Sequence, residues 1–258
     1  MKNYLNIFAA LLLCTTLLSS CKERSEGELE QAVGSFVNSV GDALEDALQS
    51  GSGSATAENN DIVVKMEGAI NHDKYDKTQS ATVEFSRIPK TIAEFKKVQQ
   101  TLGVEPHGAV ALEVMAMEMY LVDPDLGRQA LELNNSANNI SFVVDRLKEH
   151  RRENDSYAQR YLMASFLKGA TPENGYNPTK PYTVQVRVNP AVAYSEDNFG
   201  DNGTYINLQV LRGGSDRQWH GVRVCKPYGS DYFLVNNNPD MYVQCKKIKA
   251  GQTFNGLE

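Results

Sequence analysis

Residues 109–122 read AVALEVMAMEMYLV, and in a helix they are apolar on nearly every face, interrupted mainly by Glu113 and Glu118. A helix that is hydrophobic all round is buried, because none of its faces suits water. Pro106 precedes the run at a first-turn position, where its fixed backbone angle favours a helix. The stretch therefore predicts a central helix that the other elements must cover.

Helical patterns continue on both sides of this run. Thr91 and Glu94 have the spacing of a capping box, and Gly103 is placed to end that helix. Asp123 followed by Pro124 favours another helix start. The predicted helical block covers 91–168, with its later helices at 124–133, 139–149 and 156–168.

Residues 182–188 read YTVQVRV, in which tyrosine and valines alternate with polar residues. This period of two predicts a half-buried strand. Strands at 62–64 and 81–85 are expected to pair with each other, and further strands are expected at 204–212, 219–226, 231–235 and 241–247. The predicted fold class is α+β, with an N-terminal helical block followed by a C-terminal antiparallel β-sheet (182–248), in a domain over 61–258.

Residues 1–20 have the pattern of a signal peptide, in which Lys2 is followed by an apolar run over 5–18. That run is too short for a stable transmembrane helix. It ends in Leu18-Ser19-Ser20-Cys21, which resembles the lipobox of bacterial lipoproteins. The resemblance implies cleavage before Cys21 and a lipid anchor on that cysteine; the alternative is an ordinary secretory signal with a coincidental cysteine. No second long apolar run follows, so the membrane is expected as a partner through the anchor alone.

Lys22 follows Cys21 where inner-membrane lipoproteins have aspartate, so the resemblance implies the outer membrane. Acidic residues over 23–28 resemble the surface-export signal of Bacteroides-type lipoproteins. Two locations stay open: the cell surface and the periplasmic face of that membrane.

Residues 21–60 are expected to form a tether. Apolar residues recur at helical spacing over 28–49, and no lysine or arginine occurs over 25–50. An acidic amphipathic helix does not suit a lipid surface, so 28–49 is expected to pack on its own domain or to self-associate with a second copy. Residues 51–56 (GSGSAT) have the composition of a flexible linker.

The charge balance excludes some classes of partner. The 258 residues include 26 Lys and Arg and 32 Asp and Glu, a net charge of −6. No basic stripe stands out, so neither nucleic acid nor an anionic lipid surface is an expected partner.

Cys225 and Cys245 are the cysteines left once the signal peptide and the lipidated residue are set aside. Both fall in strand-like segments of an exported chain, so a disulfide between them is expected. Its loop of about 20 residues would contribute roughly 3 kcal/mol. The alternative is two reduced, buried thiols that act as small apolar residues.

Motifs for catalysis are weak in this sequence. Ser165 and Lys168 match the Ser-x-x-Lys pattern of penicillin-recognising enzymes, but the companion motifs of that family are absent, so a chance match is expected. Glu113 and Glu118 invite a two-carboxylate glycosidase hypothesis, yet five residues place them about 140° apart around a helix. Partly exposed or individually paired carboxylates are the favoured alternative, and no catalytic residue is predicted.

The four histidines are not clustered at the spacing of zinc ligands, so neither a metal nor a cofactor is predicted. His107 is expected to cap a helix, and an acid–base cluster with Glu113 and Glu118 is the alternative. Residues 196–203 are rich in oxygen donors, but their register does not fit a calcium loop. A long hairpin loop is the favoured interpretation, with calcium as the alternative.

Aromatic residues are frequent after residue 175. Trp219, Tyr228 and Tyr232 are the candidate binding residues, because aromatic rings exposed on a sheet can stack on sugar rings. The alternative is that aromatic residues are simply favoured in strands.

The tail over 182–248, the helical block and the lipobox together resemble an uncharacterised lipoprotein family of gut Bacteroides. That family has no assigned activity, so the resemblance implies no catalytic residues. The leading prediction is a lipid-anchored cell-envelope protein, a non-enzymatic binding or assembly module whose C-terminal sheet contacts a glycan or a protein. The rival prediction is a hydrolase of envelope or dietary glycans, and a third is a scaffold that assembles through 28–49.

Overall fold

The computed structural model describes residues 61–71, 76–152, 155–192, 199–200 and 203–257. The chain divides into two units, Met1–Asn59 and Asn60–Glu258, and the described residues belong to the second. The predicted signal peptide, Cys21, the helix at 28–49 and the linker at 51–56 lie outside them. No helix in the described part of the chain has the length and apolarity to cross a bilayer.

The described elements are helices and strands in a mixed order. The strands are β1 (Val64–Gly68), β2 (Ser80–Phe85), β3 (Tyr182–Val188), β4 (Phe199–Gly200), β5 (Gly203–Leu211), β6 (Trp219–Lys226) and β7 (Leu234–Asn237). The helices are α3 (Ile92–Leu102), α4 (Pro106–Val122), α5 (Pro124–Asn134) and α6 (Ala137–His150). Short 3₁₀ turns lie at Ala164–Phe166, Pro172–Asn174 and Pro239–Tyr242.

The strands form one antiparallel sheet in the order β1-β2-β3-β5-β6-β7, and β4 pairs with β5. The α+β class is therefore confirmed. The predicted order, a helical block followed by a sheet, holds only in part. The β1–β2 pair comes before the helices, yet it lies in the same sheet, because β2 pairs with β3 over six residues of each strand.

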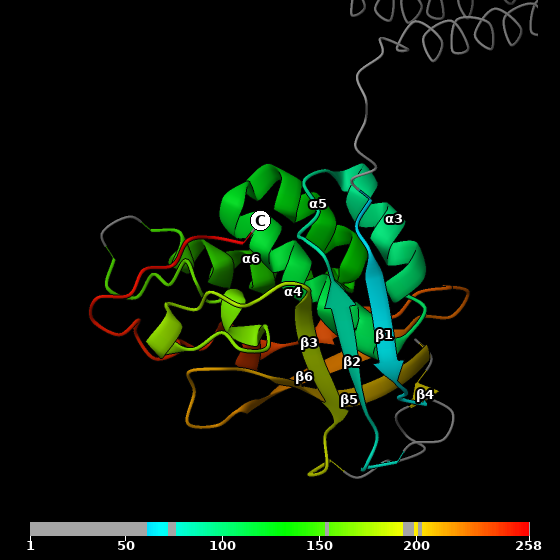
Figure 1. Cartoon of the computed structure of the whole chain (residues 1–258). Helices are drawn as coiled ribbons and strands as arrows, with labels where there is room; N and C mark the ends of the chain where they lie inside the picture. The colour runs from blue at the N-terminus through cyan, green and yellow to red at the C-terminus, as the bar shows by residue number, and fades with distance from the viewer. Residues whose placement is uncertain (1–60, 72–75, 153–154, 193–198, 201–202, 258) are drawn as a thin grey trace, which may run out of the picture. The chain divides into compact units, whose positions relative to one another are not determined.

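Helix α4 occupies the core, as its apolar sequence predicts. Every residue from Pro106 to Leu121 is buried. Strands β2, β3, β5, β6 and β7 contact it, as do α3, α5 and α6, and Figure 1 shows these helices gathered on one face of the sheet. Gly127 lets α5 approach α4 closely, because a Cβ there would lie 2.0 Å from the backbone nitrogen of Tyr120.

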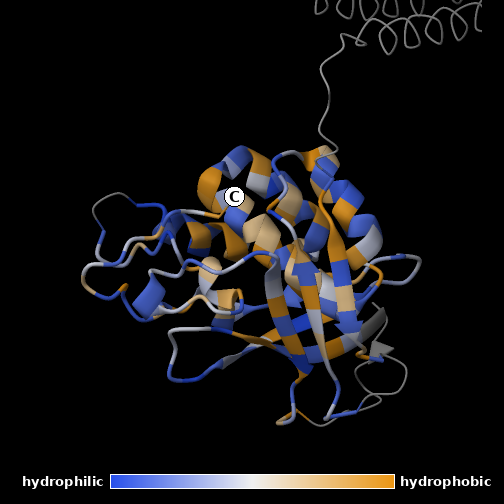
Figure 2. Cartoon of the chain, in the orientation of Figure 1, coloured by the Kyte–Doolittle hydropathy of each residue, from blue (hydrophilic) through white to orange (hydrophobic). Residues whose placement is uncertain are grey.

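Each strand presents one face to this helix layer and one face away from it. On β3 the valines and Tyr182 are buried, while Thr183, Gln185 and Arg187 are partly exposed, as the predicted alternation requires. Figure 2 shows the alternation of apolar and polar residues along the strands. We call the face that carries Gln185 and Arg187 the outer sheet face; no described helix covers it (Figure 1).

The sheet is split where β3 meets β5. Strand β3 pairs with β5 only at Val186–Val188. Residues 164–171 fill the gap beside the first half of β3: Leu167 forms a bridge with Val184, and Lys168 N–H donates to the Thr183 carbonyl at 2.8 Å. The predicted helix at 156–168 is therefore wrong, because backbone groups at its end pair with strands rather than with a helical turn.

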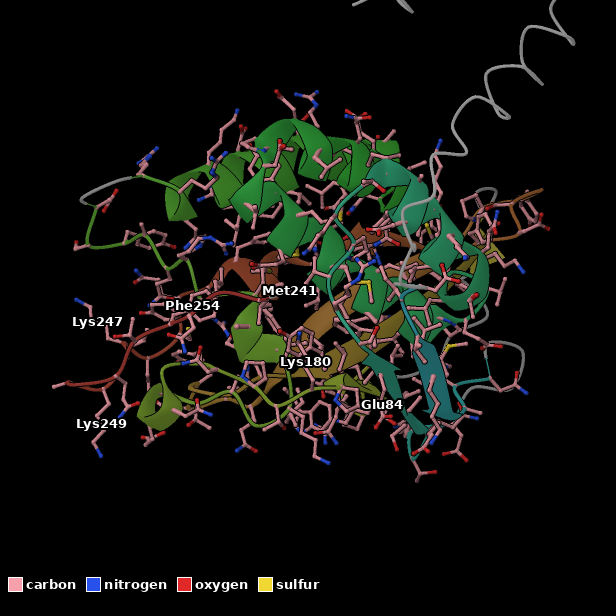
Figure 3. All side chains as sticks on the ribbon, turned by 45° about the horizontal axis from the view of Figure 1, so that its top comes forward. Glu84, Lys180, Met241, Lys247, Lys249 and Phe254 are labelled. Atoms are coloured by element: carbon pink, nitrogen blue, oxygen red, sulfur yellow. The ribbon has the colours of Figure 1, made fainter. Side chains whose placement is uncertain are left out.

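The predicted strand at 241–247 is also wrong. Residues Pro239–Tyr242 form a 3₁₀ turn, and Met241 points into the core while Lys247 and Lys249 point outward (Figure 3). The backbone of Cys245 binds a side chain instead of a strand. Its N–H donates to Gln159 Oε1 at 2.8 Å, and Gln159 Nε2 donates to its carbonyl at 2.7 Å.

This arrangement also corrects the predicted disulfide. Cys225 lies in β6 opposite Tyr205 and Leu234, whereas Cys245 lies beyond the 3₁₀ turn against Gln159. Both are free, buried thiols. The alternative interpretation, in which the two thiols act as small apolar residues, matches the structure.

A buried amide network ties α4 to the elements around it. Glu113 of α4 is fully buried, and its carboxylate accepts hydrogen bonds from three side-chain amides. Asn134 and Asn135, at the end of α5, donate at 2.9 and 2.7 Å, and Asn238, after β7, donates at 2.9 Å. One carboxylate therefore fixes the end of α5 and the end of the sheet relative to the central helix.

We expect Asn238→Ala to lower the free energy of unfolding by about 3 kcal/mol, measured by urea denaturation. The change removes a donor to Glu113 and to Tyr242 Oη, and it removes the acceptor of Asn139 Nδ2. The exposed neighbour Asn237 provides the control, and Asn237→Ala should change stability by less than about 0.5 kcal/mol. Equal effects of the two changes would contradict a special role for the network.

Candidate functional site

An open groove of about 410 Å³ lies on the outer sheet face, between the start of β2 and the start of β6. It is lined by residues 77–82, Gln185, Val186, Arg187 and Trp219. Hydroxyl, amide and basic groups surround one aromatic ring, and the lining contains no carboxylate, histidine or cysteine. Such a surface can stack on a planar or ring-shaped group and hydrogen-bond to its polar substituents.

Trp219 is covered by Arg187, which is itself held by Gln209. The guanidinium of Arg187 lies over the indole ring, with its Cζ 4.1 Å from the ring centroid. Arg187 Nε donates to Gln209 Oε1 at 2.9 Å, and the two residues are cross-strand partners on β3 and β5. These contacts hold the guanidinium against the ring: Gln209 is the cross-strand neighbour of Arg187, and the long arginine side chain reaches across β5 to Trp219 on β6. We call this set the Trp219 cluster: Trp219, Arg187 and Gln209.

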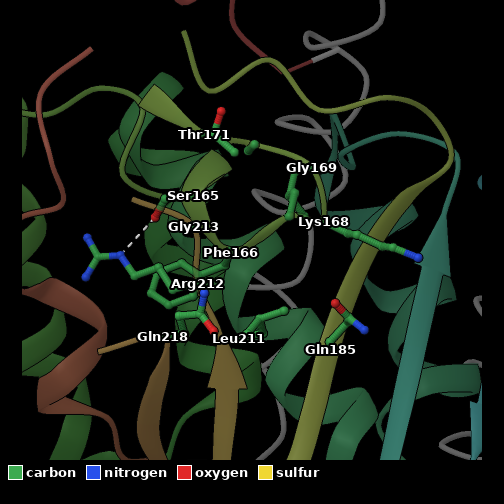
Figure 4. Close-up of a pocket in the computed structure, with 12 residues that line it drawn as sticks. Ser165, Phe166, Lys168, Gly169, Thr171, Gln185, Leu211, Arg212, Gly213 and Gln218 are labelled. Atoms are coloured by element: carbon green, nitrogen blue, oxygen red, sulfur yellow. Dashed lines mark hydrogen bonds between the residues drawn. The ribbon is translucent and has the colours of Figure 1, made fainter. Parts of the chain in front are cut away.

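A second depression, of about 170 Å³, lies at the split between β3 and β5 (Figure 4). Its lining comprises residues 165–171, Gln185, residues 211–213 and Gln218. It shares Gln185 with the groove, so the two depressions adjoin. This lining too has no carboxylate, histidine or cysteine.

Ser165 and Lys168 both line this second depression, but they do not form a nucleophile pair. Ser165 Oγ donates to the Leu162 carbonyl at 2.5 Å and accepts from Arg212 Nε at 3.0 Å. In Figure 4 the Lys168 side chain extends away from Ser165. The hydroxyl is thus engaged by neighbours and has no base beside it, in agreement with a chance match to Ser-x-x-Lys.

Arg212 is the largest fully buried side chain among the described residues. Its guanidinium packs on Phe166, 5.1 Å from the ring centroid, and its two terminal nitrogens have no hydrogen-bond partner in the described part of the chain. Burial lowers the pKa of Arg212, and the nearby Cys245 raises it. Arg212 is therefore a lining residue whose guanidinium is buried against Phe166.

The three aromatic residues predicted to bind lie in different places. Trp219 begins β6, and Tyr228 follows its end, on the order of 25 Å away along an extended strand. Tyr228 is 74% exposed, and no groove residue adjoins it in sequence. Tyr232 packs against the end of α3, where its ring lies 3.1 Å from a Cβ built on Gly103. The structure does not bring the three residues together, and only Trp219 lies in the groove.

The glutamates singled out for catalysis are buried and separately partnered. Glu113 lies in its amide network, where burial raises its pKa to about 7 although hydrogen bonds from Asn134, Asn135 and Asn238 lower it. Glu118 pairs with Arg160 through two bonds of 3.0 and 2.7 Å. Each carboxylate is individually partnered, as the favoured alternative allowed, but neither is partly exposed.

The histidines are also dispersed. His107 is the second residue of α4, whose N-cap is Glu105, so the expected cap role is wrong. Both ring nitrogens of His107 lack a partner among the described residues, and burial lowers its pKa to about 4. His150 and His220 each contact a backbone carbonyl, of Tyr242 and Asp240. Most of the candidate calcium loop lies outside the described residues, and those described contain no cluster of metal ligands.

Sequence reasoning missed Arg187 and Gln209. Each stands at an outward position of a strand that the alternation predicted. Their partnership depends on the β3–β5 register, which places Arg187 opposite Gln209. The alternation was enough to predict that both side chains lie on the outer sheet face. Predicting that they are neighbours also required the register of β3 against β5.

Comparison with known proteins gave one match. A family model described as a domain of unknown function (DUF6935) matches residues 87–249, more than half of the chain. Neither the curated proteins nor the solved structures yielded a significant match.

Trp219 is the one tryptophan of the chain, so its fluorescence reports on the Trp219 cluster. We expect Arg187→Ala to raise the rate of acrylamide quenching, because the guanidinium no longer shields one ring face. Arg217→Ala is the control, since Arg217 lies close in sequence but pairs with Asp240. Unchanged quenching in Arg187→Ala would show that the guanidinium does not cover the ring in solution.

The raised pKa of Glu113 has a consequence for stability. A carboxyl whose folded pKa lies above its unfolded value of 4.5 stabilises the fold at low pH, and that contribution is lost as pH rises through about 7. The buried His107 acts in the opposite sense, because its contribution is lost as pH falls from 6.5 towards 4. We therefore expect wild type to lose up to about 3 kcal/mol relative to Glu113→Gln between pH 5 and pH 8, measured by urea denaturation. A difference that stays constant with pH would contradict the raised pKa.

Proposed function

The chain belongs to the DUF6935 family, a domain of unknown function, and on this premise we propose that it is a lipid-anchored, non-enzymatic binding module of the cell envelope. Its ligand is a glycan, which lies in the groove on the outer sheet face and stacks on Trp219. The anchor is the acylated Cys21, and residues 21–60 hold the folded unit away from the outer membrane.

The observation that carries this proposal is a fixed aromatic ring in an open, polar groove. Trp219 is partly exposed, its position is held by Arg187, and hydroxyl and amide groups from β2 and β3 surround it. Glycans present alternating apolar ring faces and hydroxyl groups, which match an aromatic ring bordered by hydrogen-bonding side chains. A ring already held in place loses little conformational entropy on binding.

The rival function, a hydrolase of envelope or dietary glycans, would need acid and base groups that converge on the ligand. Neither depression is lined by a carboxylate or a histidine. Glu113 and Glu118 are buried and individually partnered. The absence of acid and base groups from the two linings favours binding over hydrolysis, so hydrolysis is the second candidate.

Isothermal titration of the full chain against neutral xylo- and cello-oligosaccharides and acidic oligogalacturonates tests the proposal. We expect Trp219→Ala to weaken glycan binding at least tenfold, about 1.4 kcal/mol, because the stacking surface is lost. Tyr228→Ala is the matched control, since it removes a more exposed ring that lies outside the groove.

Binding that survives Trp219→Ala unchanged would place the glycan elsewhere on the molecule. Release of new reducing ends during the titration would favour the hydrolase instead. Absence of binding to every glycan would overturn the proposed function.

A further inference from the structure

The outer sheet face carries a second cluster built like the Trp219 cluster. The guanidinium of Arg223, on β6, lies over the ring of Tyr205, on β5, with its Cζ 5.5 Å from the centroid. Arg223 Nε donates to Asn236 Oδ1, from β7, at 2.9 Å. Each cluster thus combines an arginine, an aromatic ring and a side-chain amide taken from adjacent strands.

Both clusters hold the arginine in the same way. The planar guanidinium lies over the aromatic ring, and the amide oxygen accepts a hydrogen bond from the arginine Nε–H. The four terminal nitrogens, two on Arg187 and two on Arg223, have no hydrogen-bond partner within the described residues. A guanidinium fixed in this manner presents a preformed fork that matches the two oxygens of a carboxylate.

The charges near the clusters favour an anion, although the whole chain has a net charge of −6. The groove around Trp219 also contains Lys77, and the adjoining depression contains Lys168, with no carboxylate in either lining. The nearest carboxylate along β6 is Asp240, beside Gly221, and it is engaged by Arg217 at 2.6 Å. The same face also carries Glu84 on β2 and Glu67 on β1, and Glu67 pairs with Lys65. Near the two clusters, an incoming anion therefore meets cations that have no carboxylate partner among the described residues.

The register fixes the separation of the two arginine Cα atoms. Arg187 lies opposite Gln209, Gln209 lies opposite Gly221, and Arg223 follows two residues further along β6. Two strand spacings and two residues give roughly 12 Å between the two arginine Cα atoms. The outward amides of Gln209 and Asn207 lie between the forks, at positions suited to hydroxyl groups.

We propose that the outer sheet face binds an acidic polysaccharide of the uronic acid class, with one carboxylate on the Arg187 fork and another on the Arg223 fork. The inference rests on the proposed glycan function and specifies its ligand. Aromatic rings beneath the guanidinium groups and amides between the two arginines suit sugar rings and hydroxyls. Nucleic acids and anionic membranes are usually met by denser basic surfaces.

The test compares two ligands that differ only at their carboxyl groups: oligogalacturonate and its fully methyl-esterified, uncharged form, titrated into the full chain. We expect the acidic form to bind at least tenfold more tightly, and this preference to shrink at high salt. Arg187→Gln and Arg223→Gln should each weaken oligogalacturonate binding about tenfold and the double variant about a hundredfold, because the forks lie on separate strands.

Two further variants separate the fork from simple charge. Arg187→Lys keeps the charge but not the bidentate geometry, so it should recover only part of the lost affinity. Arg128→Gln, on α5, changes the net charge equally but removes a residue paired with Glu132, and it should bind like wild type. Circular dichroism melting of every variant confirms that these solvent-facing changes leave the fold intact.

Equal binding of the acid and its ester, unaffected by the arginine changes, would overturn this inference and leave the proposed glycan function standing. No binding of any glycan would overturn both. Arginine-dependent binding of phosphatidylglycerol vesicles or single-stranded DNA, without binding of oligogalacturonate, would assign the forks to another anion and overturn the proposal.

Discussion

A helix with no solvent face must be covered on every side, and this constraint shapes the domain. Helix α4 is buried from Pro106 to Leu121, so the sheet covers one side of it and the other helices cover the rest. The constraint extends to its polar residues. Glu113 and Glu118 cannot reach water, and each is satisfied by partners from elements distant in sequence. Through its hydrogen bonds, the carboxylate of Glu113 holds the end of α5 and the end of the sheet in place against α4.

Covering one face of the sheet with helices leaves the opposite face for recognition. The side chains there are pinned by cross-strand contacts rather than by burial in the core. Arg187 and Arg223 each share a surface with a ring and an amide, so their positions are set before any ligand arrives. The polarity of the face follows directly from the alternation in β3, β5 and β6.

Local patterns predicted part of this structure and could not predict the rest. The bounds of β3 and β6 match the predicted strands, and the burial of α4 follows from a helix sequence that is apolar on nearly every face. The helix predicted at 156–168 and the strand predicted at 241–247 failed because their backbone partners, Thr183 and the Gln159 side chain, are set by the tertiary fold. The predicted disulfide is wrong for the same reason, because the tertiary fold places Cys245 against Gln159 and Cys225 in β6. Trp219 was found as an exposed aromatic residue, but its partner Arg187 required the strand register, which no single segment encodes.

The family match begins at residue 87, just after β2 ends at Phe85. Strand β2 nevertheless supplies backbone partners along all of β3. The matched stretch is therefore shorter than the folded unit, which also includes β1 and β2. Cut at residue 87, it would leave β3 as a bare sheet edge, with a row of unpaired amides open to association with other chains. The hairpin ahead of the matched residues therefore protects this edge of the sheet from pairing with another chain.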